Sequence, residues 1–143
     1  MSTPGFATSR DAEKAFYAAF ERASLEDMMN VWADYDGIVC IHPAGPRLVG
    51  RDAVRRSWRQ ILQGGARLRF ELGDAAITVE GGIAVHCVNE NIRHGAGFAE
   101  RSLVLATNVY VATDRGWRMI VHHASPAPVR SPAEEAPPPS TLH

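Results

Sequence analysis

The chain has 143 residues, of which 45% are hydrophobic and 22% charged, and its 15 basic and 16 acidic side chains give a formal net charge of −1. That length suits one domain with its own core, and the balanced charge does not favour nucleic-acid binding, which needs a basic face. Because the sequence has neither a long apolar run nor a signal-peptide pattern, we expect a cytoplasmic protein that does not bind membranes.

Three amphipathic helices are predicted in the first half of the chain from apolar residues at helical spacing. They are expected at residues 11–22, from residue 24 onward and at residues 51–62. Ser24 and Asp27 resemble a capping box at the start of the second helix. Gly64 and Gly65 end the third helix. Its four arginines are interpreted as a solvated face: Arg51, Arg55, Arg56 and Arg59.

Strands are predicted between and after the helices. A β-branched run at residues 38–41 ends at His42-Pro43, because proline lacks the ladder donor, and residues 44–50 are expected to be a loop. After Gly65 the apolar period changes to two, which predicts strands at residues 67–72, 76–80, 83–94, 100–113 and 116–124. Short glycine-containing turns between them favour antiparallel pairing. Helices followed by a meander indicate an α+β fold.

The domain is expected to span residues 9–127, with a flexible arm at residues 1–8 and a disordered proline-rich tail at residues 128–143. Cys40 and Cys87 lie inside apolar runs and are interpreted as buried free thiols.

The strand at residues 100–113 is apolar on both of its faces. Leu103 and Leu105 alternate with Val104 and Ala106. A second apolar face predicts a homodimer that packs sheet to sheet. The alternative is a monomer whose sheet is simply apolar.

Three segments carry a family resemblance: SLEDMMNVWADYD (24–36), IHPAGPRLVGRDAVRRSW (41–58) and GWRMIVHHASP (116–126). In this order they resemble the nuclear-transport-factor-2-like superfamily, and within it the SnoaL-like branch. The resemblance implies a cystatin-like α+β barrel, in which a curved antiparallel or mixed sheet forms a cone wrapped by three N-terminal helices. It also implies an apolar pocket at the mouth of the cone and dimers formed through the sheet.

The same resemblance leaves the function open, because this fold hosts isomerases, cyclases, dehydratases and non-catalytic association domains. A similar closing strand, with histidine before serine, occurs in the association domain of calcium/calmodulin-dependent kinases, which builds oligomers and is not an enzyme.

His42 is the candidate catalytic residue. In ketosteroid isomerase, a member of the superfamily, the general base is an aspartate just before a proline at the end of the first strand, and His42 precedes Pro43 in the matching place. The alternative is a histidine that caps the strand. The isomerase also uses a tyrosine of the first helix as an oxyanion donor. Phe16 matches that position, and Tyr17 is turned from it by about 100°, which argues against ketosteroid isomerase itself.

Further residues are candidates for substrate binding. His122 and His123 are neighbours on one strand, so at most one of them faces the pocket. Arg101 either binds a carboxylate or pairs with Glu90 or Glu100. Trp32 and Trp58 pack in the core or line the pocket. Four more polar residues either line the pocket or hold an interface together: Asn89, Asn91, Asn108 and Tyr110.

The sequence therefore predicts a small-molecule-binding protein whose ligand is apolar or contains a carbonyl group. It could be an isomerase or cyclase that needs no cofactor or metal and abstracts a proton next to that carbonyl, with His42 as the base. Asn89, Asn108, Tyr110 or one of the last two histidines would hold the oxyanion. The alternative is a non-catalytic dimerisation module. An inward His42 beside an open pocket favours the first, and a pocket filled by Phe16, Trp32 and Trp58 favours the second.

Overall fold

The computed structural model describes residues 5–128. Within this range the helices are α1 (Ser9–Arg22), α2 (Leu25–Val31) and α3 (Arg51–Gln63), with a 3-10 turn η1 (Ala96–Phe98). The strands are β1 (Val39–Ile41), β2 (Arg47–Val49), β3 (Arg69–Glu80), β4 (Ile83–His94), β5 (Glu100–Thr113) and β6 (Gly116–Pro126).

Side-chain caps fix where the first two helices begin. The Thr8 hydroxyl accepts a hydrogen bond from the Asp11 amide at 3.0 Å, so α1 starts at Ser9, two residues before the predicted start. The Ser24 hydroxyl accepts one from the Asp27 amide at 3.2 Å, which confirms the predicted N-cap of α2. Each contact satisfies an amide that has no partner within the helix.

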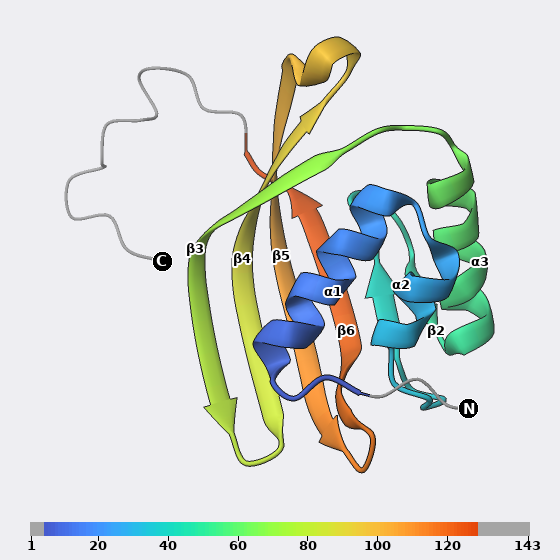
Figure 1. The fold of residues 1–143 in the computed structure, drawn as a ribbon, viewed down its shortest axis with the longest axis vertical. Coiled ribbons are helices and arrows are strands. Elements are labelled where there is room, and N and C mark those ends of the chain that lie inside the picture. The colour runs from blue at the N-terminus through green and yellow to red at the C-terminus, as the bar shows by residue number, and fades with distance from the viewer. Residues whose placement is uncertain (1–4, 129–143) are drawn as a thin grey trace.

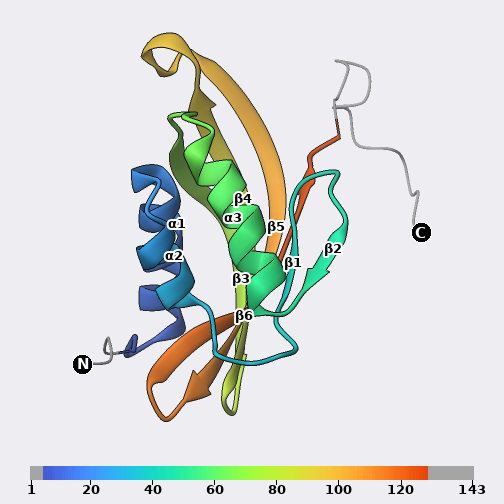
Figure 2. The same ribbon diagram turned by 90° about the vertical axis from the view of Figure 1, so that its right-hand side faces the viewer.

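Within residues 5–128 the six strands form one mixed sheet in the order β2-β1-β6-β5-β4-β3. In this described sheet β1 and β6 pair in parallel, and the other neighbouring strands pair in antiparallel fashion. The sheet curves around α1 and α3, which lie against its concave face (Figure 1, Figure 2). The predicted α+β class, with three helices packed on a curved mixed sheet, is confirmed.

Two strand predictions were wrong. Residues 44–50 were expected to be a loop, but Arg47–Val49 forms β2, because it pairs with β1 in the register Val39↔Val49. The two strands predicted at residues 67–72 and 76–80 are one strand, β3, whose register shifts between Gly73 and Ala76. That bulge lets the strand bend with the sheet without ending.

Period-two alternation separates the two faces of the sheet. On β4 the buried residues are Ala84, His86, Val88 and Glu90, which face the helices. Cys40 is buried, but Cys87 is exposed because its strand parity places it on the convex face. The prediction that both thiols are buried was therefore wrong for Cys87.

The described part of the predicted N-terminal arm contacts the domain. Phe6 pairs with Trp117 across an isolated bridge, and the Trp117 amide donates to the Phe6 carbonyl at 2.8 Å. Nearly all of the predicted tail, residues 129–143, lies outside the described range. Among residues 5–128, no helix has the length and apolar character needed to cross a membrane.

Candidate functional site

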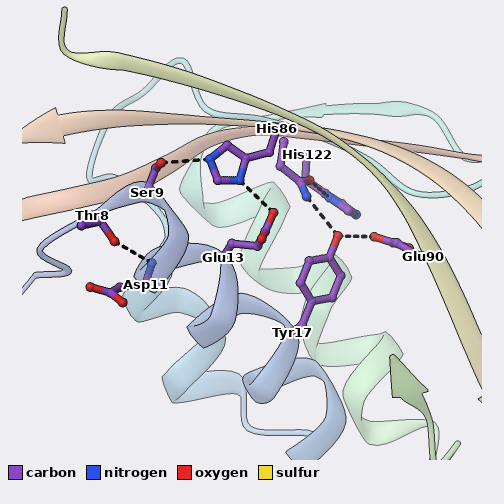
Figure 3. A network of polar contacts seen from close by, with 9 residues as sticks. Thr8, Ser9, Asp11, Glu13, Tyr17, His86, Glu90 and His122 are labelled. Carbon is purple, nitrogen blue, oxygen red and sulfur yellow. Dashed lines mark hydrogen bonds and ion pairs between the residues drawn. The ribbon is translucent and has the colours of Figure 1, made fainter. Parts of the chain in front are cut away.

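The concave face of the sheet carries a row of buried polar side chains. His86, Asn108 and His122 lie side by side on β4, β5 and β6, because they are register partners across the three strands. Each is at most 2% exposed, and Glu90 on β4 is 3% exposed. Buried polar groups need partners, and α1 supplies several of them (Figure 3).

Four residues form one continuous hydrogen-bonded chain, which we call the Tyr17 chain: Glu90, Tyr17, Asn108 and His122. The Tyr17 hydroxyl donates to the Glu90 carboxylate at 2.6 Å. The Asn108 amide nitrogen donates to the Tyr17 oxygen at 3.0 Å. His122 Nδ1 donates to the Asn108 Oδ1 at 2.6 Å, since that oxygen can only accept. The neutral His122 ring therefore carries its free lone pair on Nε2.

Burial sets the protonation states of the Tyr17 chain. It raises the pKa of Glu90 to about 7, against the hydrogen bond from Tyr17, which lowers it. Burial, followed by the nearby Glu90 charge, raises the pKa of Tyr17 well above its ordinary range. Burial, followed by the charges of His42 and His123, lowers the pKa of His122 to about 3. Near neutral pH, Tyr17 is thus protonated and His122 is neutral, while Glu90 is present in both its protonated and its ionised form.

A second polar cluster lies beside the Tyr17 chain. His86 Nδ1 contacts the Glu13 carboxylate at 2.8 Å, and His86 Nε2 contacts the Ser9 hydroxyl at 2.9 Å. The Tyr110 ring packs 4.8 Å from the His86 ring. The Tyr110 hydroxyl is buried and has no hydrogen-bond partner among the described residues. This cluster ties α1 to β4 at the first turns of the helix.

His42 follows β1 and reaches the same side of the sheet. Its Nε2 lies 3.0 Å from the Ser57 hydroxyl and 3.5 Å from the Cys40 sulfur. Ser57 donates its own proton to the Val54 carbonyl at 2.8 Å, so its oxygen accepts from His42 Nε2. The neutral ring then carries its lone pair on Nδ1. Burial lowers the pKa of half-buried His42, which favours this neutral form.

Aromatic rings join His42 to the Tyr17 chain. The His42 ring lies 4.8 Å from the Trp58 ring and 6.4 Å from the His122 ring. Phe16 packs 4.9 Å from His122. Because Phe16 and Trp58 are fully buried, their rings fill the space between the helices and the sheet at this point. This is the arrangement expected from the sequence for the dimerisation module rather than for an open pocket. Side chains packed around this core are only partly buried: Phe20, Ile61, Leu62, Phe70 and Leu72.

The structure divides the predicted site residues between two faces. Trp58, Asn108, Tyr110 and His122 are buried on the concave side with His42 nearby. Trp32 is also buried, but it pairs with Met119 at the end of α2. The remaining four have the opposite strand parity and lie on the convex face: Asn89, Asn91, Arg101 and His123.

One sequence interpretation paired Arg101 with Glu90, and the structure shows that these two residues lie on opposite faces of the sheet. Glu90 faces the helices and binds Tyr17, whereas Arg101 is exposed on the other face. The four-arginine face of α3 is also only partly solvated. Arg51 is partly buried and donates to the carbonyl groups at the end of α2: Met29, Trp32 and Ala33.

The sequence interpretation missed Tyr17, Glu90, Glu13 and His86. His86 and Glu90 alternate along β4 in step with the apolar Val88, and this pattern could have predicted that they share its buried face. Tyr17 was expected to be turned away from Phe16, but both are buried. Their rings pack edge to face at 4.8 Å, because α1 sits within a curved sheet that contacts a wide arc of the helix.

Several hollows lie outside the concave site. One of them, of about 810 Å³, is bounded by α2, the first turns of α3 and the β5–β6 turn. Two hollows on the convex face have volumes of about 430 and 310 Å³ and include Arg101 and His123, respectively. Among residues 5–128, no group of three histidine, cysteine or acidic side chains is placed to hold a metal ion.

Comparison with known proteins identifies related chains. The family model of the SnoaL-like domain matches residues 10–130. A structure from Thiobacillus denitrificans, described as a candidate calcium/calmodulin-dependent protein kinase type II association domain, is 43% identical, with a TM-score of 0.82 over 88% of this chain and 100% of that one. No protein with a curated description matches the chain.

Two further structures extend the comparison. A candidate dehydratase of the NTF2-like family from Streptomyces avermitilis is 35% identical, with a TM-score of 0.73 over 81% of this chain and 91% of that one. An uncharacterised protein with a cystatin-like fold from Caulobacter vibrioides is 17% identical, with a TM-score of 0.70 over 84% of this chain and 87% of that one, and it supports the fold alone.

Proposed function

Because the chain belongs to the SnoaL-like domain family, we propose that it binds a small apolar molecule with a carbonyl group at the concave face of its sheet. The observation that carries this proposal is the Tyr17 hydroxyl, held between Glu90 and Asn108 on a buried face. A phenol in a desolvated setting is a strong donor to an oxygen on which negative charge develops. Because the rings of Phe16 and Trp58 fill this space, the ligand would have to displace them, entering along the partly buried rim of Phe20, Leu62 and Phe70.

The proposed reaction is an isomerisation through an enolate. Neutral His42 removes a proton from the carbon next to the carbonyl, and the electron pair of the broken C–H bond moves onto the carbonyl oxygen. Tyr17 donates a hydrogen bond to that oxygen. The imidazolium of His42 then returns the proton to another carbon of the conjugated system, which restores the carbonyl. Trp58, 4.8 Å from His42, forms the apolar wall of the site.

Glu90 controls whether Tyr17 is available for this role. An ionised Glu90 accepts a hydrogen bond from the phenol O–H, as in the observed 2.6 Å contact. A protonated Glu90 donates to the Tyr17 oxygen instead, and the phenol O–H becomes free for a ligand. Because the pKa of Glu90 is about 7, the active form would be populated on the acid side of neutral pH.

Deuterium exchange tests this function. Small cyclic ketones, including a β,γ-unsaturated one, are incubated with the protein in D2O, and deuterium at the carbon next to the carbonyl is measured by NMR. We expect exchange above the protein-free background, and we expect His42→Ala to abolish it. The matched control is His94→Ala, which removes a histidine at the far end of β4. Unchanged exchange in His42→Ala would overturn the assignment of the base.

A second function is favoured by the convex face. Four large apolar residues there or at its β3–β4 edge are 40–53% exposed: Val79, Ile83, Leu103 and Leu105. Two structural relatives are described as candidate association domains. We propose that this face packs against a second copy of the chain, with Asn89, Asn91, Arg101 and His123 at the interface. Sedimentation velocity should then show a dimer that dissociates on dilution.

A further inference from the structure

The groove of about 810 Å³ between α2, α3 and the β5–β6 turn is separate from the concave site. The segments that form it meet at one end of the molecule, where the β5–β6 hairpin turns below α2 (Figure 2). Its volume is within the range of small-molecule pockets. Its lining differs from that of an ordinary surface depression, because it includes the buried aromatic side chain of Trp32 and the buried cationic side chain of Arg118.

Four arginines line this groove: Arg51, Arg55, Arg115 and Arg118. Two of them are fixed by the backbone. Arg51 donates to the Met29 carbonyl at 3.3 Å and to the Trp32 carbonyl at 3.2 Å. Arg118, only 8% exposed, donates to the Asn30 carbonyl and to the Arg115 carbonyl at 3.3 Å. The carbonyl oxygens orient the Arg51 guanidinium group but carry no charge that would neutralise it.

The pKa of Arg118 reflects how close the other cations are. Burial lowers the pKa of Arg118, and the charges of Arg115 and Arg51 lower it further. Carboxylates are present at the groove, but they offset the cations only in part. Asp34 lies 3.9 Å from Arg51 with its side chain 98% exposed, so water screens the contact strongly. Glu26 and Asp114 complete the acidic lining.

Trp32 supplies an independent observation. It lines the groove and is 2% exposed. Its indole N–H is buried and has no hydrogen-bond partner among the described residues. A buried donor without an acceptor is unfavourable, and an oxyanion bound in the groove would supply an acceptor. The nearby Tyr35, 47% exposed, provides an aromatic surface at the rim.

We propose that this groove binds a small molecule that carries an oxyanion, a carboxylate or a phosphate, on an aromatic or apolar body. The guanidinium groups would bind the oxyanion, because arginine matches both anions with paired hydrogen bonds. Trp32, Met29 and Tyr35 would contact the body of the ligand. The site is independent of the concave site, so either can exist without the other.

The probes are benzoate and phenyl phosphate, with benzamide and phenol as their neutral counterparts. Each is titrated into the full chain labelled with ¹⁵N, and the indole N–H resonance of Trp32, assigned through Trp32→Phe, is followed. We expect a saturable shift with at least one anion and not with its neutral counterpart. The anion that binds distinguishes a carboxylate site from a phosphate site.

The test variant is the double substitution Arg55→Gln and Arg115→Gln, which keeps the backbone contacts of Arg51 and Arg118. It should weaken anion binding about tenfold or more, the typical effect of losing charge-assisted contacts. Arg59→Gln, on the same helix but outside the groove, is the matched control and should bind as the original chain does. Absence of a saturable shift with both anions, equal binding of the neutral probes, or undiminished binding by the double variant would overturn the proposal.

Discussion

The Tyr17 hydroxyl of α1 lies 2.6 Å from the Glu90 carboxylate of β4, and both groups are buried between the helix and the sheet. The contact joins residues 73 positions apart in the chain. It couples the packing of α1 to the protonation state of Glu90, because each group determines which hydrogen bond the other can make. Stability and the proposed chemistry therefore depend on the same pair.

Tyr17→Phe should destabilise the protein. It removes the hydroxyl and leaves both the Glu90 carboxylate and the Asn108 amide without this partner in a buried setting. The expected loss in the free energy of unfolding is about 1–3 kcal/mol, measured by urea denaturation at neutral pH. Tyr35→Phe makes the same change at an exposed position and should stay within about 0.5 kcal/mol of the original chain. An equal effect of both substitutions would contradict the role of the pair.

Glu90→Gln should change how stability depends on pH. The pKa of Glu90 rises from an ordinary 4.5 to about 7 on folding, so between these values the folded state holds a proton that the unfolded state has lost. The unfolding free energy therefore falls as pH rises through this window. At about 1.4 kcal/mol per pH unit, the stability of the original chain should fall by about 3 kcal/mol relative to Glu90→Gln.

The measurement is a series of paired urea titrations of the original chain and Glu90→Gln from pH 4.5 to 7.5. Because both proteins share every other titrating group, their difference isolates Glu90. A difference that does not change with pH, or one that changes with the opposite sign, would contradict a buried Glu90 with a raised pKa.

Asn108→Asp should raise the pKa of His122 from its value of about 3. The new carboxylate would accept from His122 Nδ1 at the position of the present 2.6 Å contact, and an adjacent negative charge favours the imidazolium. A pH titration of the ring nitrogens by NMR measures the change. Asn91→Asp, which places the same charge on the convex face, should leave His122 as it is. A His122 pKa that does not move in Asn108→Asp would mean that the two side chains are not in contact.

Leu105→Glu should prevent dimer formation if the convex face is the interface. Leu105 is 40% exposed, so the charge costs little in an isolated protomer but is unfavourable between two apolar sheets. Sedimentation velocity should show a monomer that still unfolds cooperatively, without the stabilisation that association gives the original chain. Arg59→Glu on α3 is the control and should remain a dimer. A Leu105→Glu protein that still dimerises would exclude this face.

Local sequence patterns predicted most of the fold. The turns around Gly81 and Gly116 bounded β4 and β5 correctly, because period-two alternation and hairpin chemistry act over a few residues. The strand β2 could not be predicted in the same way. Its three residues follow a proline and are ordered by pairing with β1, a contact that no local pattern encodes.

The site was less predictable than the fold, for a geometric reason. Parity placed His122 and His123 on opposite faces, but it did not identify which face is concave. The rotation of α1 within the sheet, which brings Tyr17 to Glu90, is set by the packing of Phe16 and Trp58. Such a rotation follows from tertiary packing and not from helix periodicity alone.

The most direct test of the central claim is the pH profile of ketone deuterium exchange. We expect a bell-shaped profile. The rate rises as His42 loses its proton, below the ordinary pKa of 6.5 because burial lowers it. It falls near pH 7 as Glu90 ionises and accepts the Tyr17 hydrogen bond. In Glu90→Gln the alkaline fall should disappear. Exchange at the protein-free rate, or an alkaline fall that persists in Glu90→Gln, would contradict the proposed roles of His42, Tyr17 and Glu90.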